Sequence, residues 1–162
     1  MGYGLKTLTT SSGTPFQVTY DGHIEWHPGS VTIDWSTVAA VSGSDLVLVG
    51  DQVTVPIGQK VLVAGQVMVE ITASGLYGPY DTAAADGRQT MIAGKVGILN
   101  MTIIQNGVLG VTAGNPDNVN ILHGGNVHYG RVRHSGVATH SLILGPTLAE
   151  LLAVLPRLTF RY

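Results

Sequence analysis

The stretch from Gly65 to Leu99, GQVMVEITASGLYGPYDTAAADGRQTMIAGKVGIL, contains the main predictors of the fold. Residues 66–72 alternate, with valine and isoleucine at every second position, and this period of two is typical of a half-buried strand. Residues 73–75, Ala-Ser-Gly, predict a turn, because glycine readily adopts the positive φ of a tight turn. Residues 91–99 predict a strand that returns to the core. Two strands joined by a long connection are therefore expected here.

The connection itself has two distinct parts. Tyr77-Gly78-Pro79-Tyr80-Asp81 predicts a rigid loop with aromatic side chains, and Asp86-Gly87 predicts a second turn. Residues 23–29 predict a connector, and Asn106-Gly107 predicts a hairpin turn between apolar runs. Gly50-Asp51 indicates another hairpin. Further alternating or β-branched runs predict strands at residues 16–20, 31–35, 46–49, 53–55, 61–64, 101–104, 108–112, 119–122 and 158–162.

One helix is expected, near the end of the sequence. Pro146 suits a first helical turn, and Pro156 ends the segment. Between them an apolar stripe at helical spacing is formed by Leu148, Leu151, Leu152 and Leu155. The sequence therefore predicts a mainly β protein, a compact barrel or sandwich with one short C-terminal helix and an extended N-terminal arm.

The composition suggests that other subunits cover part of the surface. The chain has 162 residues, of which 11% are charged, against about 25% in ordinary soluble domains. A Gly-rich soluble monomer is the alternative. No apolar run approaches the roughly 18 residues that cross a membrane, so no membrane partner is expected. The eight Lys and Arg residues are scattered and the net charge is −2, which argues against nucleic-acid binding. The absence of cysteine excludes disulfides and thiolate metal sites.

The N-terminal segment is unlike a core element. Residues 1–14, MGYGLKTLTTSSGT, are rich in Gly, Ser and Thr, and such a segment buries too little area to offset the entropy of ordering. It is either a frayed terminus or an arm that orders on a partner. We therefore divide the chain into an arm, residues 1–22, and a β-rich domain, residues 23–162. The candidate anchors of the arm are Tyr3, Leu5, Leu8, Phe16, Val18 and Tyr20.

Searches for chemical motifs give no catalytic, metal or cofactor-binding residues. His128, His134 and His140 recur every six residues, but intervening glycines make one continuous strand improbable, and no HExxH motif accompanies them. The chain has no GxSxG motif and no GxxxxGK[ST] motif. We therefore expect no enzyme, no metal and no cofactor. Sugars or bases could stack on Tyr77, Tyr80, Trp26 and Trp35, although core or interface packing is the favoured role of these aromatics.

The ordered series of segments resembles a known family. A strand ending in ITASG, the YGPYD loop, an Ala-rich run closed by Asp-Gly, and a strand ending in VGIL occur in this order. His123-Gly124 and a terminal helix followed by an aromatic strand come later. This series, within residues 50–162, resembles the bacteriophage head decoration, or cement, protein family. Many members have an acidic residue soon after that His-Gly, where this chain has Gly125 and Asn126.

The resemblance implies a function as well as a fold. It implies a β-tulip-like domain that forms a homotrimer on the outer surface of an icosahedral capsid. The expected partner is the major capsid protein, the expected location is the virion, and the expected role is resistance to internal DNA pressure. Two alternatives remain: a carbohydrate-binding β-module or adhesin, and a small β-barrel hydrolase or metal-dependent isomerase.

Overall fold

The fold is mainly β, as the sequence predicts. The computed structural model describes residues 19–48, 53–105, 118–132 and 145–161. The hairpin predicted around Asn106-Gly107 lies outside these residues, as do His134 and His140. Within the described residues there is one α-helix, α2 (Leu148–Val154), and the strands form mainly antiparallel sheets without closing into a barrel.

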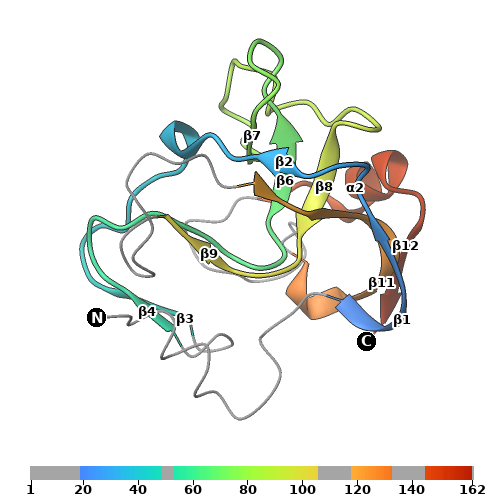
Figure 1. Cartoon of the computed structure of the whole chain (residues 1–162), viewed down its shortest axis with the longest axis horizontal. Coiled ribbons are helices and arrows are strands. Elements are labelled where there is room, and N and C mark those ends of the chain that lie inside the picture. The colour runs from blue at the N-terminus through green and yellow to red at the C-terminus, as the bar shows by residue number, and fades with distance from the viewer. Residues whose placement is uncertain (1–18, 49–52, 106–117, 133–144, 162) are drawn as a thin grey trace.

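The principal sheet joins segments from both ends and the middle of the chain (Figure 1). Its strand order is β1 (Thr19–Trp26), β11 (Ile121–His128), β8 (Val96–Leu99), β6 (Val67–Glu70) and β7 (Tyr77–Pro79). The final strand, β12 (Leu158–Arg161), runs parallel to β11, whereas the other pairs in this sheet are antiparallel. β11 therefore contacts β1, β8 and β12.

Three small two-stranded sheets accompany the principal sheet. They are β2 (Val31–Thr32) with β10 (Asn118–Val119), β3 (Leu46–Leu48) with β4 (Val53–Val55), and β5 (Val61–Leu62) with β9 (Ile103–Ile104). Two 3-10 turns, η1 (Trp35–Thr37) and η2 (Tyr129–Arg131), complete the described elements together with α2 (Leu148–Val154). The pairing of β3 with β4 confirms the predicted hairpin in this region.

The central strand β6 is buried on both faces, so the predicted half-burial was wrong. Val67 and Val69 belong to a cluster on the α2 side, which includes Leu151 and Leu155. Met68 belongs to a second cluster with Trp35, Tyr77 and other residues on the opposite side. The core is thus two apolar layers on either side of one sheet, and a third small cluster lies beneath β3 and β4.

The C-terminal helix begins at Leu148, two residues later than Pro146. Thr147 is the N-cap, and its side chain and that of Glu150 form a reciprocal capping box with each other's backbone N–H groups. Leu151 and Leu155 are fully buried against the sheet. The apolar stripe therefore identified the packed face, although the sequence placed the start of the helix two residues early.

Several boundaries differ from the sequence prediction. Residues 91–95 form a loop, and β8 starts at Val96. Residues 23–26, predicted as a connector, continue β1, so the proposed boundary at residue 22 lies inside a strand. The strand predicted over residues 31–35 ends at Thr32, because Asp34 caps η1 by accepting a hydrogen bond from Ser36.

Candidate interaction surface

The predicted arm residues are placed only in part. Tyr3, Leu5, Leu8, Phe16 and Val18 lie in residues 1–18, outside the described part of the chain. Tyr20 lies in β1, near the end that follows residue 18. The surface that the structure does describe is therefore the rest of β1 and its neighbours.

Two large apolar side chains of β1 are exposed to solvent. Ile24 is 40% exposed and Trp26 is 46% exposed, whereas most other large apolar residues of the main sheet are buried. Among the described strands β1 pairs with β11 alone, so its other edge has no described strand beside it. An exposed edge with apolar side chains is the kind of surface that a further strand or subunit covers. The sequence analysis did not select Ile24, because residues 23–29 resembled a connector.

The glycines of β11 allow β1 to lie close. Gly125 has a φ of +110°, and a Cβ there would overlap the carbonyl oxygen of His23 and lie 2.9 Å from the Cα of Ile24. The pairing is also irregular: Glu25 pairs with Gly124 and the next residue, Trp26, pairs with Leu122. β11 therefore has one extra residue at this point, His123, and such bulges redirect side chains.

A small charge cluster links β1 to Arg157, the residue before β12. Glu25 lies between the ring of His23, at 2.7 Å, and the guanidinium of Arg157, at 3.2 Å. The hydrogen bond from His23, followed by that from Arg157, lowers the pKa of the Glu25 carboxyl. Because all three groups are near solvent, their contacts orient these side chains but contribute little to the stability of the fold.

Two histidines and a tyrosine meet where β1 ends. The His27 and His123 ring centroids are 6.0 Å apart, and His27 lies 5.9 Å from the Tyr77 ring in an edge-on arrangement. The Nε2 atom of His27 donates a hydrogen bond to the carbonyl oxygen of Gly94 at 2.9 Å. The Nδ1 atoms of both histidines are buried and have no hydrogen-bond partner within the described structure.

The chemistry of this histidine cluster is limited. Burial, and then the charge of Glu70, raises the pKa of the Tyr77 hydroxyl, which keeps it protonated at neutral pH. In the parts of the chain that the structure describes, no three His, Asp or Glu side chains are arranged to hold a metal ion. The meeting of His27 with His123 depends on the pairing of β1 with β11, which no local sequence motif indicates.

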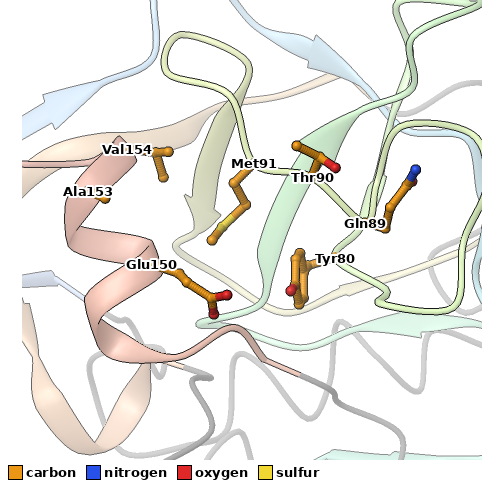
Figure 2. Close-up of a pocket in the computed structure, with 7 residues that line it drawn as sticks. All are labelled: Tyr80, Gln89, Thr90, Met91, Glu150, Ala153 and Val154. Carbon is orange, nitrogen blue, oxygen red and sulfur yellow. The ribbon is translucent and has the colours of Figure 1, made fainter.

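A pocket of about 300 Å³ lies between α2 and the loop before β8. Figure 2 shows Glu150 on the helix, with Met91 and Tyr80 on the other side of the space. Burial, and then the negative charge of Glu150, raises the pKa of the Tyr80 hydroxyl. Hydrogen bonds from the Thr147 side chain and backbone lower the pKa of Glu150, which is therefore ionised at neutral pH. No local motif marks this pocket, because its walls are distant in sequence.

The four aromatic residues considered for stacking separate into two groups. Trp35, Tyr77 and Tyr80 are each less than 8% exposed, and they pack in the core clusters, as the favoured interpretation expected. Trp26 is exposed. One aromatic of the four, Trp26, is therefore accessible to a partner.

Comparisons with known proteins give no match: no family model, no curated protein and no solved structure is similar to this chain. In the described parts of the chain, no helix combines the length and the hydropathy needed to pass through a bilayer.

Proposed function

We propose that this chain is a capsid decoration protein of a bacteriophage. It binds the outer surface of an icosahedral head as a homotrimer, contacts the major capsid protein, and stabilises the shell against the pressure of the packaged DNA. The proposed role is structural and non-enzymatic. It rests on the family resemblance of residues 50–162 and on the mainly β fold that the resemblance implies.

The observation that carries the proposal is the pair of exposed apolar side chains on β1, at an edge that pairs with no described strand. Ile24 and Trp26 lie on a strand that follows directly from residues 1–18, the part of the predicted arm that precedes β1. The arm and this edge would together form one continuous attachment surface. An added strand gains affinity from backbone hydrogen bonds and specificity from alternate side chains.

Trimerisation would make such attachment firm. Ordering an arm costs about 1–2 kcal/mol per residue, so one arm binds weakly. When one arm of a trimer has bound the shell, the other two arms bind intramolecularly, which strengthens attachment of the whole trimer. The low content of charged residues, 11%, fits a protein with much of its surface covered by subunits.

The direct test is capsid binding by a truncated chain that begins at Thr19. This truncation removes residues 1–18, which hold five of the six predicted anchors, and keeps β1 whole with Tyr20. We expect it to fold and trimerise as the full chain does, and to fail to co-sediment with undecorated capsids of its own phage. A full-length Trp26→Ser variant should bind more weakly while it remains folded, because Trp26 is exposed.

The matched control is full-length Ile57→Ser, which removes an apolar side chain that is 55% exposed outside β1. It should decorate normally. Normal decoration by the truncated chain would overturn the arm as the anchor. Native mass spectrometry that finds only monomer or dimer, with no trimer on particles, would overturn the oligomer.

The exposed ring of Trp26 also favours a second candidate, a carbohydrate-binding module. Exposed aromatic rings stack on the apolar faces of sugars. A glycan array followed by thermal-shift measurements separates the candidates, because a module of this kind is stabilised by its glycan and loses binding in Trp26→Ser. Capsid binding without any glycan response would favour decoration.

A further inference from the structure

The pocket beside α2 combines one fixed negative charge with an apolar wall. Glu150 supplies the carboxylate, and Met91 and Val154 supply much of the apolar lining. The hydroxyls of Tyr80 and Thr90 add hydrogen-bonding oxygens (Figure 2). A ligand that matches these walls has an apolar stem and a cationic head.

The carboxylate is held in position without being neutralised. Its Oε2 atom accepts hydrogen bonds from the Thr147 backbone N–H at 2.8 Å and the Thr147 hydroxyl at 2.7 Å. None of the ion pairs among the described residues includes Glu150. Four of the described cations bind elsewhere: Lys60 to the Trp35 carbonyl, Arg88 to Asp86, Lys95 to Glu70 and Arg157 to Glu25.

We propose that this pocket receives an arginine side chain of a partner protein. A guanidinium has five donors in one plane, so it can bind a carboxylate and neighbouring hydroxyls together, and it stacks on aromatic rings. Its aliphatic stem suits the wall formed by Met91 and Val154. Because the capping box already fixes Glu150, little side-chain entropy is lost when the ligand binds.

Two features favour a protein partner as the source of the arginine. Gln89, Thr90 and Glu150 are exposed at the mouth, so the pocket opens directly to the surface. Ile92, which follows Met91 in the chain, is 52% exposed. An apolar side chain next to an acidic pocket is a typical arrangement in a protein interface, where arginine is enriched. The inference goes beyond the decoration role and does not depend on it.

The test compares two probes of nearly equal shape on the full chain. Nα-acetyl-arginine methylamide carries the charge, and Nα-acetyl-citrulline methylamide replaces the guanidinium with a neutral urea. We expect the arginine probe to shift the NMR signals of residues 89–91 and 150–154, and the citrulline probe to bind at least about tenfold more weakly. Added salt should weaken binding of the arginine probe.

Three variants separate the role of the Glu150 charge from the role of the pocket volume. Glu150→Gln removes the charge and still serves a capping box, so it should reduce arginine binding about tenfold with the fold intact. Ala153→Leu should reduce binding by filling the pocket, because Ala153 is an exposed lining residue. Asp45→Asn removes an equal charge at an exposed residue outside the pocket, and should bind like the parent chain.

Three results would overturn the assignment. Equal binding of the citrulline probe, or unchanged arginine binding by Glu150→Gln, would remove the role of the charge. Equal binding of a lysine probe, Nα-acetyl-lysine methylamide, would refute the preference for arginine. Failure to decorate capsids would leave these measurements unaffected, so the two proposals fail separately.

Discussion

Replacing Gly125 with alanine tests how closely β1 lies on β11. The φ of +110° is unfavourable for any residue with a Cβ, and the new methyl group would overlap the carbonyl oxygen of His23. Backbone strain of this kind costs about 1–3 kcal/mol, and displacement of the β1 backbone adds to it. We expect Gly125→Ala to lower the free energy of unfolding by about 3 kcal/mol or more.

The matched control is Gly75→Ala. Gly75 also has a positive φ, +71°, but nothing lies within 4 Å of a Cβ built there. Its replacement should therefore lower the free energy of unfolding only by the strain of alanine in the left-handed conformation, about 1 kcal/mol. The difference between the two variants isolates the contact with β1.

Urea unfolding followed by tryptophan fluorescence measures both effects. With a slope of about 2 kcal/mol per molar urea, Gly125→Ala should lower the midpoint by about 1.5 M and Gly75→Ala by about 0.5 M. Equal midpoints for the two variants would refute the close approach of β1. A normal midpoint for Gly125→Ala, together with protease cleavage within residues 19–26, would show that β1 had detached without cost.

Three further outcomes are expected. The pKa of Glu25 is lowered, so its ionised form stabilises the fold above the ordinary carboxyl pKa of 4.5. This contribution is lost as the pH falls through the lowered pKa. The urea midpoint of Glu25→Gln should therefore lie below that of the parent chain at neutral pH and approach it in acid. Leu151→Ala, at a fully buried position, should cost about 2–5 kcal/mol, and Leu152→Ala, at a partly buried one, distinctly less; equal losses in urea unfolding would refute the packing of α2. Trp26→Ser should change the unfolding free energy by no more than about 0.5 kcal/mol, and a larger loss would show that Trp26 is packed.

Local sequence patterns predicted the elements whose determinants are close in the chain. The alternation of residues 66–72 identified β6, and the leucine stripe identified the buried face of α2. Both-sided burial of β6 was missed, because Met68 packs against Trp35 and Tyr77, and no local period reports such contacts. β8 begins later than predicted because the turn closed by Lys95 N–H and Ile92 carbonyl occupies the expected strand.

Long-range pairing explains the remaining differences. Residues 23–26 have the composition of a connector, yet they form a strand because Gly124 and Gly125 let their backbone approach β11. The same pairing brings His27 to His123 and exposes Trp26. The pocket likewise needs α2 and the loop before β8 to meet. The predicted arm anchors remain predictions, since five of the six lie outside the described residues.

The position of β11 has a consequence for how the chain is made. This strand pairs with residues near the start of the chain, in β1, and with β12, which ends at Arg161. The principal sheet therefore cannot be completed until β12 has left the ribosome. Pairings so distant in sequence form slowly, and until then the edges of β8 and β11 stay open to neighbouring chains. Newly made chains are thus prone to aggregate between the synthesis of β11 and that of β12, and slow translation of the residues between them would prolong that interval.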